Sequence, residues 1–290
     1  MTWTAKIVRR PRLGRTSARE IARMMTPAAT VHRVDRPPPI GQFDIAIRWG
    51  CTNTVPEQRV LNSAEAIHAV NDKVAFRKLL EPTNLCPKTW FDFDDVPYDR
   101  LSYVLENDVI IRPSRHAQGR RLWVCHTYHQ MMRTLTDPLD NEEYYISQLI
   151  PKTHEYRVFI VQGRVAWVAR KTPGNPQDVA WNVARGGRFD NVRWSDWPLQ
   201  VVRYACEAFA LTSLDFGGVD VMYDSNASKS YVLEINSAPS QTSPYRQQAA
   251  ANCFSYIMQR ENKERIPMVE SLGGYRKFIH PALTNEALMV

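Results

Sequence analysis

GGVDVMYD (residues 217–224) and YVLEINSAP (residues 231–239) are the stretches that decide the fold. Each is an apolar run interrupted by a carboxylate, Asp220 in the first and Glu234 in the second. The polar segment between them predicts two strands joined as a hairpin. Side chains two positions apart in a strand share a face, so Glu234 and Asn236 point the same way, and Asp220 can reach that face from the paired strand. Oxygen ligands of this kind hold Mg²⁺ together with substrate phosphates. The alternative, ordinary exposed strand residues, fits poorly with the apolar neighbours on both sides.

Strands dominate around this hairpin. Residues 145–150 and 155–161 are predicted strands, and the turn at Gln162 and Gly163 leads into a third at 164–170. Helical periodicity covers 198–211 and 244–260. The last thirty residues carry no clear period.

The first seventy residues predict a small α/β unit. Strands are expected at 5–8, 30–34 and 43–48. Capping boxes begin at Ser17 and Asn62, each with a glutamate three residues on, and predict two helix starts. A helix over 71–80 follows, and then strands at 88–91, 109–112 and 122–125. Between the last two lies the basic loop 114–121, of a kind that can close over phosphates.

Composition fits a globular protein. The 290 residues are 44% hydrophobic and 23% charged, and no apolar run is long enough for a membrane helix. The start of the chain lacks the apolar core of a secretion signal. Five scattered cysteines without a CxxC pair argue against a zinc site and favour reduced thiols in the cytoplasm. A net charge of +7 favours an anionic ligand.

Several motifs in the same order resemble the ATP-grasp superfamily. GVDVMYD and YVLEINSAPS look like its C-terminal signature, and EYRVFIVQGRVAWVARK (155–171) resembles its strand–turn–strand element. ISQLI (146–150) resembles the adenine-binding hinge, NDKVAFRKLLEPTNLCPKTW (71–90) the opening segment, and VIIRPSRHAQGR (109–120) the strand and loop over the phosphates. The resemblance covers residues 60 to 260 and is nearest to ribosomal-protein glutamate ligases and uncharacterised phage-encoded relatives.

The resemblance implies a fold and three units. Two α+β subdomains would clasp ATP after a small N-terminal α/β domain. The expected boundaries are 1–70 for the N-terminal domain, 71–148 for the central subdomain with the phosphate loop, and 149–290 for the C-terminal subdomain with the magnesium site.

The resemblance also implies roles, with ATP and Mg²⁺ as the cofactors. The metal ligands would be Asp220, Glu234 and Asn236. The nucleotide would be bound by Lys73 at the phosphates, by the hinge residues Gln148, Leu149 and Ile150 at adenine, and by Glu155 at the ribose. Arg157 and Lys171 would face the phosphates or the acyl-phosphate. Asn182 and Arg185 would border the acceptor site.

One position departs from the family pattern. Arg112 stands where a lysine is usual before the phosphate loop. Arginine keeps the charge and can grip phosphate with two hydrogen bonds, although it is not equivalent to lysine. The sequence also allows other roles: Lys73 as surface charge, Arg157 in an interstrand ion pair, and Glu155 as the partner of Arg157 or as an exposed residue. His116 is expected to be a solvated loop residue. Trp49, Trp181 and Trp194 are expected to be packing residues.

The implied activity is ATP-dependent joining of a carboxylate to an amine through an acyl-phosphate. The substrate would be a small molecule or a peptide, and the location the cytoplasm, or the host cytoplasm if the chain is phage-encoded. A kinase on the same fold is one rival. A basic nucleic-acid-binding protein is the other, suggested by charge and by the arginines at 9–15, but it leaves the residues at 220, 234 and 236 unexplained.

Overall fold

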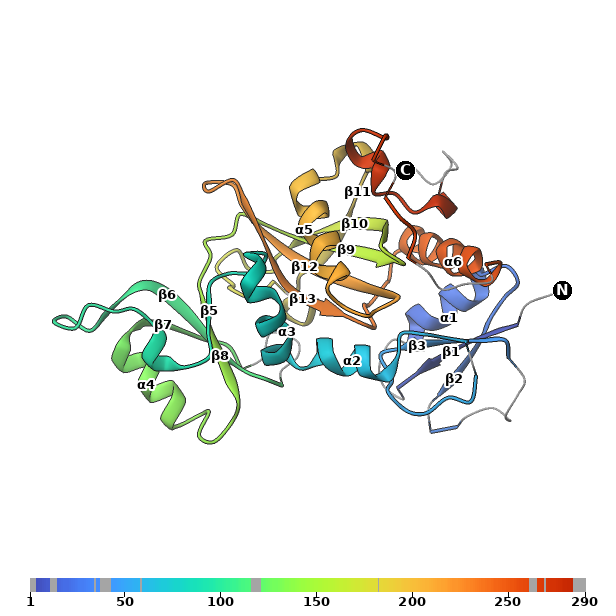
Figure 1. Cartoon of the computed structure of the whole chain (residues 1–290). Coiled ribbons are helices and arrows are strands. Elements are labelled where there is room, and N and C mark those ends of the chain that lie inside the picture. The colour runs from blue at the N-terminus through green and yellow to red at the C-terminus, as the bar shows by residue number, and fades with distance from the viewer. Residues whose placement is uncertain are drawn as a thin grey trace.

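A computed structural model describes the protein in residues 4–10, 15–33, 35–36, 43–57, 59–115, 121–181, 183–260, 265–268 and 270–283. Within these residues the chain builds three β-sheets that are arranged along an elongated molecule (Figure 1). The N-terminal sheet lies at one end, the sheet with the Asp220 hairpin lies in the centre, and a middle segment of the sequence forms the other end. The expected mixture of helices and sheets is confirmed.

The N-terminal sheet is parallel, with strand order β2-β1-β3-β4. Its strands are β1 (Ala5–Arg9), β2 (Thr30–Arg33), β3 (Ile45–Trp49) and β4 (Arg59–Leu61). Helix α1 (Arg15–Met24) connects β1 to β2. The prediction that Ser17 caps this helix is wrong, because the helix already begins at Arg15. The Ser17 hydroxyl instead donates to the backbone carbonyl of Gln241, at 3.1 Å.

Two short helices, α2 (Ala64–Asn71) and α3 (Lys73–Leu80), lead out of this sheet. The helix predicted over 71–80 begins later, because Asp72 ends α2 and caps α3 by accepting from the Ala75 amide. Ser63, rather than Asn62, caps α2. Asn62 has a φ of 63°, and its side chain binds backbone groups of Asp215 and Phe216. A tertiary contact therefore takes the place of the predicted capping role.

The middle sheet is antiparallel, with strand order β5-β8-β6-β7. Its strands are β5 (Thr89–Trp90), β6 (Val104–Pro113), β7 (Trp123–Thr127) and β8 (Tyr144–Gln148). Helix α4 (Tyr128–Thr136) packs against it and was not predicted from the sequence. Only Met131 and Thr134 of this nine-residue helix are buried.

The C-terminal sheet is antiparallel, with strand order β11-β10-β9-β12-β13. Its strands are β9 (His154–Val161), β10 (Arg164–Thr172), β11 (Arg188–Val192), β12 (Phe216–Asp224) and β13 (Lys229–Asn236). Helices α5 (Leu199–Ala210) and α6 (Pro244–Met258) pack against this sheet. Short 3-10 helices occupy Glu81–Thr83, Phe93–Asp95, Val183–Arg185, Trp194–Asp196, Gly274–Lys277 and Pro281–Leu283.

The C-terminal segment is held by one buried arginine. The Arg164 guanidinium donates to the carbonyl oxygens of Pro267 at 2.5 Å and of Ile279 at 2.7 Å. His280, next to the second of these, has no exposed surface. The described part of the stretch without sequence periodicity, 265–268 and 270–283, is therefore attached to the C-terminal sheet through its backbone.

The N-terminal and C-terminal sheets share one hydrophobic core. Trp49 stacks on Phe216 at 5.5 Å between ring centroids, and Phe254 of α6 packs edge-on against Phe216 at 5.0 Å. The middle sheet has its own core, around Ile111 and Ile146. The molecule thus has one large body and one smaller one. In the described residues, no helix is long and apolar enough to cross a membrane.

Candidate functional site

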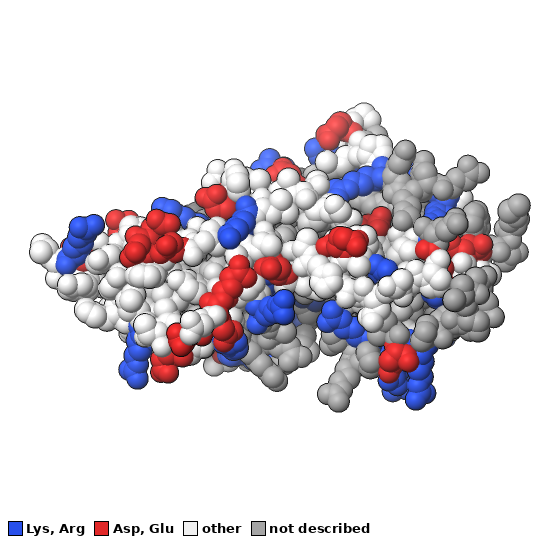
Figure 2. Space-filling model, turned by 60° about the horizontal axis from the view of Figure 1, so that its bottom comes forward, with Lys and Arg blue, Asp and Glu red and all other residues white. Residues whose placement is uncertain are grey.

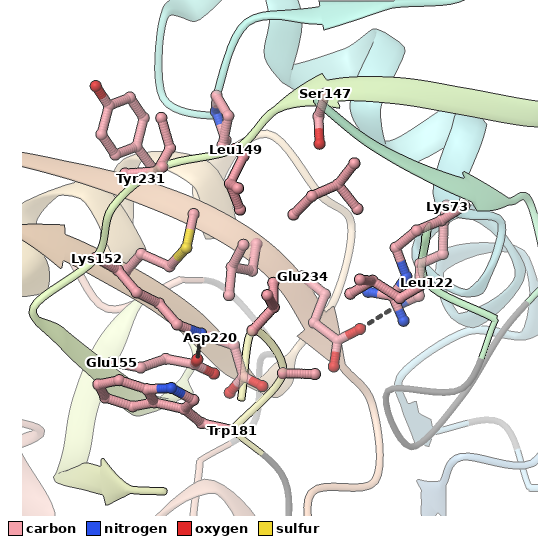
Figure 3. A pocket seen from close by; sticks show the side chains of 18 of the residues that line it. Lys73, Leu122, Ser147, Leu149, Lys152, Glu155, Trp181, Asp220, Tyr231 and Glu234 are labelled. Atoms are coloured by element: carbon pink, nitrogen blue, oxygen red, sulfur yellow. Dashed lines mark hydrogen bonds and ion pairs between the residues drawn. The ribbon is translucent and has the colours of Figure 1, made fainter. Parts of the chain in front are cut away.

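The predicted hairpin is present and brings the carboxylates together. Asp220 and Glu234 are register partners on the antiparallel strands β12 and β13, so their side chains lie on the same face. Asn236, two residues beyond Glu234, donates from Nδ2 to Glu234 Oε1 at 3.0 Å. All three residues line one large cavity (Figure 3).

This cavity has a volume of about 1380 Å³ and lies between the middle and C-terminal sheets. The middle sheet contributes Ile110 and Ser147 to its lining, and the C-terminal sheet contributes Met222 and Leu233. The hinge residues Gln148, Leu149 and Ile150 close one side. Apolar walls with a few converging charged groups are typical of a small-molecule site.

Two cations hold the Asp220 carboxylate. Arg157 of β9 is its register partner on the other side and donates to both oxygens, at 2.6 and 2.8 Å. Lys171 of β10 adds a contact at 2.8 Å. Burial alone would raise the pKa of Asp220, but the charges of Arg157 and Lys171 hold it below its usual value. Arg157 therefore forms an interstrand ion pair with Asp220, not with Glu155.

Glu155 forms a second ion-paired group beside the first. It is only 3% exposed, and it binds Lys152 at 2.5 Å and also Lys171, its register partner on β10. Burial lowers the pKa of Lys152, and the charge of Glu155 opposes that effect. Lys152 was missed in the sequence, although it lies two residues after the hinge and three residues before Glu155.

Glu234 faces a third group of positive charges. Lys73 Nζ lies 3.4 Å from its carboxylate. Burial would raise the pKa of Glu234, but Lys73, the hydrogen bond from Asn236, and the charges of Lys171 and Arg112 keep it well below its usual value. Lys73 is buried, so the surface-charge alternative is wrong.

The first turn of α3 ties Lys73 to the end of β6. The Lys73 amide donates to the Ser114 carbonyl at 3.2 Å, and the Ser114 hydroxyl donates to Asp72 at 2.9 Å. Arg112, two residues before Ser114, is half-buried and lines the cavity. The position of Lys73 is therefore fixed to the strand that carries Arg112. The role of Lys73 at the phosphates remains a prediction. The closing of the loop 114–121 also remains a prediction, because residues 116–120, including His116, lie outside the described residues.

The segment after β10 covers the acidic groups. Trp181 packs over Lys152, with Nζ 4.7 Å from the ring centroid, and its indole nitrogen donates to the Asp178 carbonyl at 2.8 Å (Figure 3). Gly174 and Gly186 meet at the base of the segment: a Cβ on Gly174 would lie 2.3 Å from the Arg185 carbonyl oxygen. Trp181 thus packs over Lys152 at the wall of the cavity, and the choice between packing and base stacking stays open.

Arg185, one of the two expected acceptor-site residues, is not among the residues that line the cavity. Arg185 lies 3.8 Å from Asp178, and its side chain is 49% exposed. Asn182 lies outside the described residues. Of the remaining tryptophans, Trp49 and Trp194 are buried as expected.

The donor set fits magnesium. Among the described residues there is no cluster of three or more histidine, cysteine or acidic side chains suited to a metal. The candidate ligands are instead two carboxylates and the amide of Asn236. Such oxygen ligands suit Mg²⁺, which takes few protein ligands and completes its shell with phosphate oxygens and water. The cations now paired with the carboxylates would also suit those phosphates.

The overall architecture matches known proteins of one kind. No protein-family model matches the sequence, and no curated protein matches it. Among solved structures, the ATP-grasp ligase PsnB with a minimal precursor has a TM-score of 0.61 at 14% identity, covering 90% of this chain and 100% of that one. D-alanine–D-alanine ligase from Bacillus anthracis has a TM-score of 0.60 at 13% identity, covering 88% and 95%. A RimK domain protein from Sphaerobacter thermophilus has a TM-score of 0.59 at 12% identity, covering 88% and 100%. The chain therefore has the ATP-grasp fold.

Proposed function

We propose that the protein is an ATP-dependent carboxylate–amine ligase. The observation that carries this proposal is the paired strands with Asp220 and Glu234, which face a cavity between two sheets and are surrounded by lysine and arginine side chains. Phosphoryl transfer depends mainly on positioning and charge neutralisation, and this is what such a cavity supplies. The fold shared with ligases supports the same reaction class.

In this proposal ATP lies in the cavity with adenine at residues 148–150. The domain units are those expected from the sequence, 1–70, 71–148 and 149–290. Asp220, Glu234 and Asn236 hold Mg²⁺, which neutralises phosphate charge when bound. Lys73 and Arg112 approach the phosphates from the side of the middle sheet. Arg157 and Lys171 approach from the C-terminal sheet, and Glu155 binds the ribose hydroxyls.

The proposed reaction has two steps. A carboxylate oxygen of the substrate attacks the γ-phosphorus, the bond to the β–γ bridging oxygen breaks, and ADP leaves. An amine then attacks the carbonyl carbon of the acyl-phosphate, and phosphate leaves as the amide forms and the nitrogen loses a proton. The cations that now hold Asp220 and Glu155 are placed to stabilise the charge that develops on the transferred group.

The test measures nucleotide binding and product together. The melting temperature is expected to rise with ATP and Mg²⁺ much more than with ATP alone. ADP release is then screened against pools of amino acids, peptides and polyamines, with mass spectrometry of the products. An amide supports the proposal, and a phosphorylated product without an amide shows a kinase. No thermal shift with ATP, ADP or a non-hydrolysable analogue would overturn the assignment.

A further inference from the structure

A second hollow, separate from the large cavity, lies on the N-terminal sheet. Its volume is about 240 Å³, and it is lined by Arg9, Arg19, Val31, His32, Arg33 and Arg36. Blue side chains gather around a red one at the lower right of Figure 2, the end of the molecule that carries this sheet. The proposed reaction assigns no role to this hollow.

The arginines converge because of the sheet topology. Arg9 and Arg33 each end a parallel strand, and they are register partners. Arg19 lies on α1, which crosses the same edge of the sheet and packs on β1 and β2. The carboxyl edge of a parallel sheet is where α/β proteins bind their ligands.

This arrangement costs stability in the absence of an anion. Like charges on directly opposed strand positions repel each other. Arg9 is 4% exposed, and its pKa is lowered by burial and then by the charges of Arg15, Arg19 and Arg33. Asp35, which accepts from Arg33 Nε at 2.9 Å, offsets part of this charge and shows that a carboxylate fits these guanidinium groups.

The hollow is adjacent to the large cavity. Arg9 lines the hollow, and the next residue, Arg10, is exposed and lines the cavity, together with Gly50 and Ser240. Consecutive residues of this chain therefore contribute to the hollow and to the cavity. An extended peptide spans about 3.3 Å per residue, so one bound along this segment would contact both.

We propose that the substrate is an acidic peptide, whose carboxylates dock on Arg10, Arg19, Arg33 and Arg36 while one carboxyl group enters the cavity. This inference rests on the proposed function. The hollow has the size of a side-chain site rather than of a nucleic-acid groove. His32 and Phe43 pack edge-on against each other at 5.4 Å between ring centroids and do not form a row of parallel rings of the kind that stacks successive bases.

The test uses a fluorescent hexaglutamate peptide and exposed arginines. The double substitution Arg19→Ala with Arg36→Ala should weaken peptide binding at least about tenfold, since each loses a charge-assisted contact. The matched control is Arg133→Ala with Arg203→Ala, which removes the same charge from exposed positions on α4 and α5. Asp35→Asn should tighten peptide binding about threefold, because the Arg33 guanidinium then no longer pairs with a carboxylate of its own chain. Hexaglutamine should not bind.

Each outcome decides between alternatives. Equal weakening in the double variant and its control, or no effect of Asp35→Asn, would overturn the docking site. An oligothymidylate that binds more tightly than hexaglutamate through the same arginines would assign the surface to nucleic acid instead. The thermal shift with Mg²⁺ and ATP is recorded for every variant. If that shift is present and the substitutions leave peptide binding unchanged, the docking site is refuted and the proposed function still stands. If it is missing in the unaltered protein, the proposed function fails.

Discussion

Replacing Asp220 by asparagine removes the buried negative charge that pairs with both Arg157 and Lys171. Its side chain is 2% exposed, and those of its two partners are 11% and 6% exposed. Breaking a buried ion pair from one side leaves uncompensated charge and costs about 3 kcal/mol or more. Glu234→Gln should cost less, about 1 kcal/mol, because Lys73 lies 3.4 Å away and the Glu234 side chain is 29% exposed. Both substitutions should abolish turnover.

The measurement is urea unfolding without nucleotide, followed by tryptophan fluorescence. Asp224→Asn is the control, since it makes the same change in the same strand, where the carboxylate accepts from the Asn226 amide at 2.9 Å. The midpoint for Asp220→Asn should lie well below those for Glu234→Gln and for the control. If Asp220→Asn and Glu234→Gln shift the midpoint equally, the ion pairs around Asp220 do not contribute as argued here.

Three further outcomes are expected. If Arg112 binds phosphate, Arg112→Lys keeps most of the ATP affinity, whereas Arg112→Met loses about tenfold or more of it with little change in the melting temperature of the free protein. A lower melting temperature with unchanged ATP affinity would mean that Arg112 forms a structural ion pair instead. Burial lowers the pKa of His280 to about 3, so the stabilising effect of the neutral imidazole is complete above its unfolded pKa near 6.5 and is lost as the pH falls from there to 3. In His280→Asn, the slope of the unfolding free energy against pH in that window should fall by up to about 1.4 kcal/mol per pH unit. An unchanged slope would contradict this expectation. Gly50 has a φ of 69°, and an added Cβ would lie 2.7 Å from the Ala238 Cβ, so Gly50→Ala should lower the free energy of unfolding by about 2 kcal/mol. Gly273→Ala should not, because a Cβ added there would have no atom within 4 Å.

The fold could be predicted where the chemistry was local. Apolar runs interrupted by Asp220 and Glu234 predicted the hairpin, because buried strands leave runs of apolar residues in the sequence. Helix α4 was missed because it is only nine residues long, and short segments give an ambiguous period. The cap predicted at Ser17 failed because a hydroxyl can satisfy a distant carbonyl as well as a local amide, and only the folded chain shows which.

The same distinction between local and distant contacts applies to the candidate site. The carboxylates and Lys73 were identified by residue type and order. Their partners were not, because Arg157 and Asp220 meet only through the strand order β9-β12, which links positions 63 residues apart. Lys152 could have been found in the sequence, since it pairs with Glu155 three residues later. The arginine hollow depends on which strands become neighbours. The roles of these residues remain predictions.

The shared core of the N-terminal and C-terminal sheets has a consequence for biosynthesis. The Thr26 amide donates to the Ser255 hydroxyl, 229 positions later in the chain, and Trp49 is covered by Phe216 and Phe254. The first sheet emerges from the ribosome long before the residues that bury its apolar face. It must therefore wait, with β3 and α1 uncovered, until helix α6 has been synthesised. Contacts this distant slow folding and leave nascent chains open to aggregation, so truncation before residue 244 should yield a chain that needs chaperone binding to stay in solution.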